Sequence, residues 1–435
     1  MKLRASLNPR RAFAVLGAAA LASLAVAVTP SSGATNTSEG IMCETDPHST
    51  FSVSAKDGWI TTPDGNSIYM WSYAMTGEDF QLPGPTLCVT EGQHVTVVLH
   101  NTLPEPTSIL FPGQLDVTAD GNPAQPQLTP GAMTSMVQAA DAPAGTDPDT
   151  VTYEFTAGSP GTYLYSSGTD IAKQQQMGLY GALVVRPSGH ADQVNSRADS
   201  VFNPDHEYLY VLSEIDPDLH LAVERGEAYD ITAYNARYFL INGRSMPDTL
   251  APNDAAWLPN QPYGAVVHIK PYDAQTNPRP ALIRYLNAGA VNYPFHPHGS
   301  DERVVNTDGH VTSGADGNDQ SYLKFDLDVQ PGQSIDALMD WRDVENWNAT
   351  TNPLPVTIPA IPDQMLPGTD TWFNETGYLG VKGLIPGGKT DNNECGEYYH
   401  IAHSHALEQA TNYGAAFGGM MTVFRIDPPS GCTTN

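Results

Sequence analysis

The chain alternates hydrophobic and polar residues over short runs, which is the pattern of β-strands whose side chains point to opposite faces in turn. Such runs occupy residues 94–99, 150–155, 181–185, 208–212, 266–269 and 420–426. Proline and glycine separate the runs at short intervals, and no helical hydrophobic period extends beyond about ten residues. The pattern predicts an all-β protein built from antiparallel Greek-key sandwiches.

Composition agrees with this class. The 435 residues include 38 glycines and 36 prolines, and only 16% of them are charged. So many turn-forming residues, beside 40% hydrophobic residues, exclude a disordered chain and a helical bundle. The formal net charge is −28, from 48 acidic and 20 basic residues. An excess of this sign argues against nucleic acid and an anionic membrane surface as partners.

The length suggests two or three domains, and the strand-like runs divide into two sandwich-sized blocks. We expect a first domain at residues 41–188 and a second at 205–430, joined by a polar linker. Within the second block, residues 343–394 are rich in Pro, Gly, Asn and Thr. We interpret this stretch as a long surface excursion.

Residues 1–34 have the composition of an export signal. Positively charged Lys and Arg residues precede an apolar, Ala-rich run at 12–28, and small residues follow up to Ala34. This order favours a cleaved signal peptide over a membrane anchor, and so a secreted or extracytoplasmic protein. The pair Arg10-Arg11 resembles a twin-arginine signal, which exports folded proteins.

Four cysteines suggest two disulfides in an exported chain. Three pairings are open. We favour Cys43–Cys88 with Cys395–Cys432, because each bond would then stay within one predicted domain and hold a terminus.

Two His-x-His pairs are the strongest candidates for chemistry. They are His296 with His298, and His403 with His405. Residues i and i+2 of a strand share a face, so each pair offers two adjacent imidazoles. Imidazole is a ligand for copper, zinc, iron or nickel. If the two strands are neighbours, four imidazoles converge on a metal site; otherwise the histidines are ordinary packed or surface residues.

Several motifs in order resemble those of the multicopper oxidases, which are built from cupredoxin sandwiches. The motifs are Gly84-Pro85-Thr86-Leu87, Gly161-Thr162-Tyr163-Leu164-Tyr165, Pro294-Phe295-His296-Pro297-His298-Gly299 and His403-Ser404-His405 with Gly419-Met420-Met421. The resemblance implies two cupredoxin-like domains, copper as cofactor at His296, His298, His403 and His405, and oxygen with a small reducing substrate as reactants.

The chain departs from the family pattern at the other copper ligands. The first two His-x-His motifs of the family are replaced by residues 110–112 and 166–168, which contain no histidine. The type 1 copper site would need a cysteine where Ser404 stands, and histidines where Tyr293 and Gln409 stand. Met420 could correspond to the axial methionine ligand of that site, but the other ligands of the site would be absent. A serine hydroxyl cannot replace the thiolate that a blue copper site requires.

Several functions stay open from the sequence. One is an oxidoreductase that acts directly at a reduced copper site, with Asp301, Glu302 or Glu408 as carboxylate ligands unless these are solvated surface charges. Another is a non-catalytic copper-binding or structural cupredoxin protein. A mononuclear cupin-like enzyme is a third, although no second cupin motif follows. Two-domain relatives often form trimers with copper at subunit boundaries, so the resemblance also suggests a homotrimer.

Overall fold

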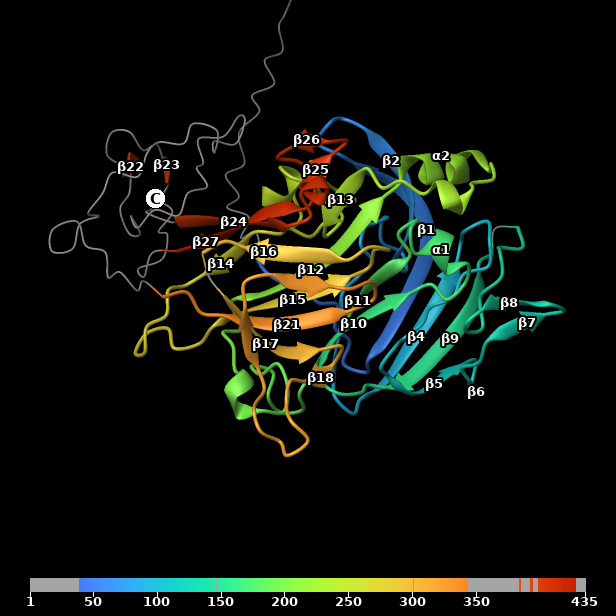
Figure 1. Cartoon of the computed structure of the whole chain (residues 1–435). Coiled ribbons are helices and arrows are strands. Elements are labelled where there is room, and N and C mark those ends of the chain that lie inside the picture. The colour runs from blue at the N-terminus through green and yellow to red at the C-terminus, as the bar shows by residue number, and fades with distance from the viewer. Residues whose placement is uncertain are drawn as a thin grey trace, which may run out of the picture. The chain divides into compact units, whose positions relative to one another are not determined.

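A computed structural model describes residues 39–145, 147–299, 301–342, 383–384, 392–393 and 398–427 of the chain. These residues form many strands and a few short helices (Figure 1), which confirms the all-β class. The strands before residue 187 and those after residue 206 form separate sheets. Both sets belong to one compact unit, so the predicted domain boundaries, 41–188 and 205–430, stay predictions.

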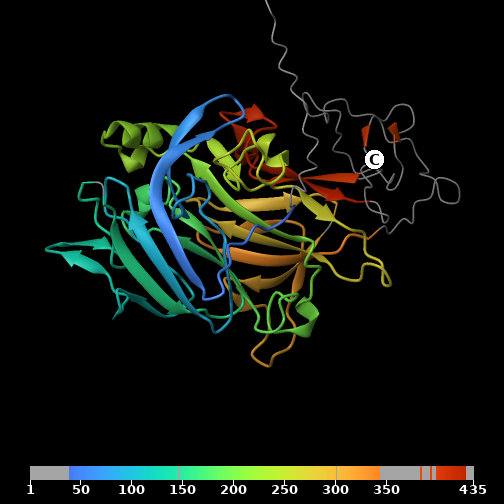
Figure 2. The same ribbon diagram turned by 180° about the vertical axis from the view of Figure 1, so that it is seen from behind.

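The first half of the chain contains a six-stranded sheet in the order β2-β1-β4-β9-β5-β6 and a three-stranded sheet in the order β10-β11-β3. Figure 2 shows β1 and β2 as the long blue strands of this half. In β4 every second side chain is buried, as the predicted alternation requires. The bounds are β1 Thr50–Thr61, β2 Ser67–Met75, β3 Leu87–Thr90, β4 His94–Asn101, β5 Leu115–Ala119, β6 Asn122–Pro123, β9 Asp149–Thr156, β10 Gly161–Ser166 and β11 Tyr180–Arg186.

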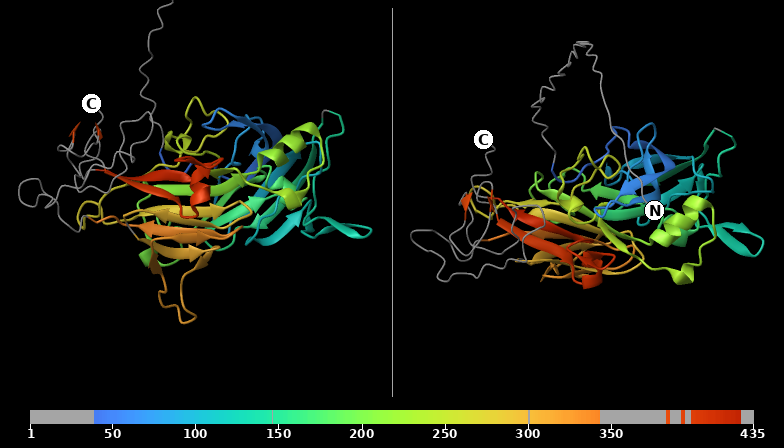
Figure 3. Two further views of the ribbon diagram at one scale, coloured as in Figure 1. Left: turned by 45° about the horizontal axis from the view of Figure 1, so that its top comes forward. Right: turned by 90° about the horizontal axis from the view of Figure 1, so that it is seen from above.

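The second half contains a seven-stranded sheet, β13-β12-β15-β21-β17-β18 with β19 paired to β17, and a five-stranded sheet, β14-β27-β24-β16-β20. Figure 3 shows the red strands of the second sheet stacked over the orange strands of the first. The bounds are β12 Glu207–Ile215, β13 Tyr238–Ile241, β14 Val267–Ile269, β15 Ala281–Asn287, β16 Tyr293–Pro297, β17 Glu302–Thr307, β18 His310–Val311, β19 Tyr322–Lys324, β20 Leu327–Val329, β21 Ser334–Met339, β24 Tyr398–Ser404 and β27 Met421–Ile426.

The remaining elements are short. They are the strand pairs β7 Gln127–Thr129 with β8 Ala132–Ser135, β22 Gly383–Leu384 with β23 Asn392–Asn393 and β25 Thr411–Asn412 with β26 Ala415–Ala416, and the helices α1 Ile171–Gln174, α2 Pro217–Arg225, η1 Ala198–Ser200, η2 Ile231–Ala233, η3 Asp248–Leu250 and η5 Leu407–Ala410. Helix α2 begins where the Asp216 side chain accepts from the amide of Asp218, and ends at Gly226 with a φ of 66°. No helix in the described ranges is long and apolar enough to cross a membrane.

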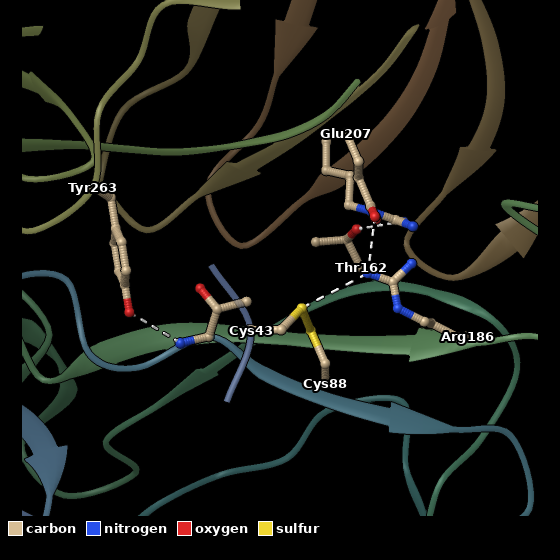
Figure 4. The surroundings of a disulfide bond; sticks show 8 residues. Cys43, Cys88, Thr162, Arg186, Glu207 and Tyr263 are labelled. Atoms are coloured by element: carbon tan, nitrogen blue, oxygen red, sulfur yellow. Dashed lines mark hydrogen bonds and ion pairs between the residues drawn. A yellow bond between two sulfur atoms is a disulfide. The ribbon is translucent and has the colours of Figure 1, made fainter. Parts of the chain in front are cut away.

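A disulfide and an ion-pair network connect the beginning of the chain to later strands. Cys43 and Cys88 are bonded, as predicted, and Arg186 lies beside them with its Nη2 2.8 Å from Glu207 Oε2 (Figure 4). Arg284 is fully buried and donates to Glu207 and to Asp336, at 2.8 and 3.0 Å. Buried charges of this kind are tolerated because each has a partner. The predicted bond Cys395–Cys432 and the export signal at 1–34 lie outside the described residues.

The runs of alternating residues in the sequence correspond to β4, β9, β11, β12, β14 and β27 in the structure, within one to three residues at their ends. The core of the second half lies between its two sheets and is rich in aromatic rings. Tyr210, Tyr285 and Phe295 meet there with ring centroids 5.4–5.6 Å apart. This core supports one face of the strands that carry both His-x-His pairs.

Candidate metal centre

Strands β16 and β24 are antiparallel neighbours, and their register places His296 opposite His403. His298 and His405 each lie two residues further along their chain segments, and the backbone amide of His405 donates to the carbonyl of Pro294 at 2.6 Å. Three of the four imidazoles are half-buried and that of His405 is exposed. The structure therefore brings all four predicted histidines together on the face of the sheet that is turned away from the core.

The four rings form one cluster. The centroid distances are 4.8 Å between His296 and His298, 5.2 Å between His298 and His403, and 5.3 Å between His296 and His405. The rings of His403 and His405 are stacked at 6.0 Å. The ring of Phe325 packs edge-on against His296, so an apolar group borders the cluster.

Backbone carbonyls set the orientation of two of these rings. His296 Nδ1 donates to the carbonyl of Phe325 at 2.5 Å, and His403 Nδ1 donates to the carbonyl of Ser404 at 2.8 Å. A neutral imidazole has one N–H, so each of these rings keeps a lone pair on Nε2. Metal-binding histidines are usually held in this way through their second nitrogen.

The pKa of His403 is lowered chiefly because the ring is largely buried. The Ser404 carbonyl opposes that effect, while the neighbouring rings of His298, His296 and His405 lower the pKa further. The neutral form of His403, which is the form that binds a metal, is therefore favoured.

The cluster suits a metal ion in two respects: its donors are imidazole nitrogens, and two of these nitrogens lie at a separation expected for ligands of one ion. His298 Nε2 and His403 Nε2 are 3.1 Å apart. Two nitrogens that each lie about 2.0 Å from one ion are separated by roughly 3 Å, in tetrahedral or square-planar geometry. Among the described residues, however, no three His, Cys, Asp or Glu side chains stand together as a finished metal site. The imidazole rings would have to shift for all four to bind one ion.

The residues that the sequence resemblance compared with type 1 copper ligands lie on the core side of these strands and in the helix η5 that follows β24. Ser404 is fully buried, and its hydroxyl donates to Gln409 Oε1 at 2.5 Å. The Gln409 amide in turn donates to the carbonyl of Asn292 at 3.1 Å. Backbone hydrogen bonds connect Met420 to both Ser404 and Gln409. A closed hydrogen-bond network of neutral groups thus fills this place, and it offers no thiolate or imidazole to a metal.

Tyr293 is also on the core face and is bonded to a buried acid. Its hydroxyl donates to Glu214 Oε2, while Tyr234 donates to Glu214 Oε1 at 2.6 Å and the amide of Ala290 does so at 2.8 Å. Burial raises the pKa of Glu214. Glu214 could not be found from local sequence patterns, because it lies 79 positions before Tyr293 and belongs to no motif.

The two histidine-free segments of the first half are themselves neighbours. The Leu110 amide donates to the carbonyl of Ser166 at 2.8 Å. Phe111 packs in a cluster of aromatic rings, 4.7 Å from Phe155, and the Ser167 hydroxyl donates to Gln174 at 2.6 Å. The two segments are therefore paired through their backbones, and their side chains serve packing and hydrogen bonding.

One of the three candidate carboxylates is buried and is no surface charge. Glu302 is fully buried, accepts from the Tyr285 hydroxyl with both oxygens, at 2.9 and 3.0 Å, and burial raises its pKa to about 8. The other two candidates, Asp301 and Glu408, are exposed. Closeness in sequence to a histidine did not indicate on which face of the sheet the acid would lie.

Comparisons with known proteins agree with this architecture. Residues 69–190 match the family model described as Multicopper oxidase. The chain is 26% identical over 276 residues to the probable nitrite reductase-hydroxylamine oxidoreductase fusion protein of Kuenenia stuttgartiensis, covering 58% of this chain and 30% of that protein. It is 29% identical over 274 residues to laccase-25 of Oryza sativa subsp. japonica, covering 61% and 40%. Thus the chain spans well under half the length of these curated relatives.

Two solved structures share the fold over most of the chain. The blue copper oxidase of Nitrosomonas europaea has a TM-score of 0.56 at 19% identity, with 86% of this chain and 85% of that chain covered. The multicopper oxidase mgLAC has the same TM-score and identity, with 89% and 88% covered. The predicted resemblance to multicopper oxidases is therefore confirmed, and the fold is of the cupredoxin-like sandwich type.

Proposed function

We propose that the chain is an exported copper-binding protein of multicopper oxidase type whose single metal centre is formed by His296, His298, His403 and His405. The separation of 3.1 Å between His298 Nε2 and His403 Nε2 carries the proposal, because it suits two ligands of one ion. Copper is favoured over the other metals that imidazole binds because residues 69–190 match the Multicopper oxidase family model.

Bound copper would supply one-electron chemistry at a position open to solvent. The chain's own residues contribute the rest: the carbonyls of Phe325 and Ser404 hold two rings in the metal-binding tautomer, and the Phe325 ring borders the site. Because the core face lacks a thiolate, a small reductant would have to react at the histidine centre itself, together with oxygen. The exposed ring of His405 leaves room for such an approach.

A non-catalytic role as an extracytoplasmic copper carrier is the second candidate. The network around Ser404 and Gln409 supports it, because these neutral groups stand where the resemblance would place the type 1 copper ligands. A homotrimer, with the histidine face at a subunit boundary, is compatible with either function. The first half lends no histidine to such a boundary at residues 110–112 or 166–168.

Copper analysis of purified protein tests the proposal. We expect the wild-type chain to retain about one copper per chain after dialysis, or a close pair, without the intense visible band of a copper–thiolate site. The variant His403→Ala/His405→Ala should lose that copper, while His310→Ala, which changes an isolated exposed histidine, should keep it. Equal copper content in the wild type and the double variant would refute the centre. Oxygen consumption with a small reductant then separates the oxidase from the carrier.

A further inference from the structure

A cavity of about 260 Å³ lies apart from the histidine cluster, between the first described residues of the chain and strands β12, β24 and β27. Four tyrosines line it, namely Tyr208, Tyr210, Tyr263 and Tyr399. Aliphatic side chains complete the wall, among them Leu250 and Val423. A lining of aromatic rings with a few polar atoms is typical of small-molecule sites in proteins.

The charged groups at this cavity already bind one another. His268 lies between two carboxylates, with Nε2 3.1 Å from Glu39 and Nδ1 3.1 Å from Asp427. Arg425 donates to the other oxygen of Asp427 at 2.8 Å. A charged ligand would lose its hydration on entering the cavity, and the charged side chains there are already paired with one another. The cavity therefore favours a neutral molecule.

One polar group of the wall has unused hydrogen-bonding capacity. The Tyr263 hydroxyl accepts from a backbone amide, that of Thr86, at 3.3 Å (Figure 4) and from Gln81 Nε2 at 3.0 Å. The Thr86 side chain is a further neighbour that lowers the pKa of Tyr263, as a hydrogen-bond donor does, so none of these contacts uses the hydrogen of the Tyr263 hydroxyl. The hydroxyls of Tyr208 and Tyr210, by contrast, donate to the carbonyls of His268 and Ala265. Tyr263 can therefore donate to an oxygen of a bound molecule.

We infer that this cavity binds a small, neutral aromatic molecule that carries one oxygen acceptor, held by stacking on the tyrosine rings and by the Tyr263 hydroxyl. The volume of the cavity limits the size of the bound molecule. An engineered cavity of about 150 Å³ holds benzene, so about 260 Å³ accommodates roughly ten non-hydrogen atoms. This inference does not depend on copper, since none of the four histidines of the cluster lines the cavity.

Titration of the metal-free full chain, after chelator treatment, tests the inference by calorimetry. The probe is acetophenone, which is neutral, aromatic and has one carbonyl oxygen. We expect saturable binding at one site, weaker binding of benzoate because of its charge, and weaker binding of ethylbenzene because it has no acceptor. Tyr263→Phe should lower the affinity for acetophenone about fivefold, which is the effect of one neutral hydrogen bond, and should leave the affinity for ethylbenzene unchanged.

Two further variants complete the design. Leu250→Trp fills the cavity from a half-buried wall position and should abolish binding of both neutral probes. Tyr208→Phe removes a lining hydroxyl that already has an acceptor, and should change acetophenone affinity by less than about twofold. Absence of acetophenone binding to the wild type, or equal loss of both probes in Tyr263→Phe, would overturn the inference. Either result would leave the copper proposal untouched, because no metal is present in the assay.

Discussion

The two faces of strands β16 and β24 differ sharply in what they offer to a metal. The outer face holds four imidazoles in one cluster, two of them oriented by backbone carbonyls. On the core side, Tyr293 of β16 is hydrogen-bonded to Glu214, and Ser404 of β24 is hydrogen-bonded to Gln409 of the following helix η5. The same backbone pairing supports both faces. Donor chemistry can thus be kept on one face and lost on the other without a change of fold.

The comparison also shows how each face treats charge. On the outer face, burial and the neighbouring histidine rings lower the pKa of His403, which favours its neutral form. The core behind them contains two acids, Glu214 and Glu302, whose pKa values are raised by burial and whose partners include tyrosines. Burial therefore shifts the pKa of His403 and the pKa values of the two acids in opposite directions, and each shift favours the neutral form.

The largest effect that we expect concerns stability in the core behind these strands, at Glu302 of β17 in the other sheet. The pKa of Glu302 rises from 4.5 to about 8 on folding, so the folded chain holds a proton that the unfolded chain has lost. The stability contribution of this group is full below pH 4.5 and falls by about 1.4 kcal/mol per pH unit until about pH 8. Glu302→Gln cannot ionise, so at pH 8 it should be more stable than the wild type by about 3–5 kcal/mol.

Urea unfolding at pH 5, 6.5 and 8 measures this difference. The gain in Glu302→Gln should grow with pH and be small at pH 5. Glu408→Gln, at an exposed position, is the matched control and should show no such trend. A gain that is independent of pH would mean that Glu302 is ionised in the folded protein.

On the outer face, single substitutions should rank the ligands. His403→Ala removes a half-buried ring that lies next to His298 and is oriented by the Ser404 carbonyl. Copper affinity should fall by about 100-fold or more, because losing a ligand costs more than the roughly 10–100-fold loss caused by removing a group that only orients a ligand. His405→Ala removes the exposed ring and should cost less. Copper competition with a chelator gives both values. A larger loss for His405 would show that the centre forms on the solvent side of the cluster.

Gln409→Leu should then break the core network without reaching the metal. Ser404 would keep a buried hydroxyl with no side-chain acceptor, and the Asn292 carbonyl would lose its donor. We expect a loss of about 1–3 kcal/mol in unfolding free energy, with copper content unchanged. Gln275→Leu, in an exposed loop, is the control and should be nearly neutral. A loss of copper in Gln409→Leu would mean that the two faces are coupled.

The shared face of each histidine pair could be predicted from the sequence, because it depends on the two-residue repeat of a β-strand. A strand repeats every two residues, so the spacing of His296 with His298, and of His403 with His405, placed each pair on one face. Long-range pairing was out of reach: nothing near Tyr293 indicated its bond to Glu214, and nothing near His298 indicated that Glu302 is buried. The cavity at Tyr263 is also assembled from distant segments, so no local motif marks it.

The smallest effect, and the sharpest test of the two faces, is expected from Ser404→Cys. The change restores the sulfur of a blue copper site, but Tyr293 and Gln409 still provide no imidazole beside it. We expect a destabilisation of about 1 kcal/mol from the weaker hydrogen bond to Gln409, and copper without an intense visible band. Absorption spectroscopy with copper(II), beside the wild type, gives the answer. An intense band would show that the outer imidazoles can turn through the sheet to reach the thiolate, and the separation of the two faces would then be incomplete.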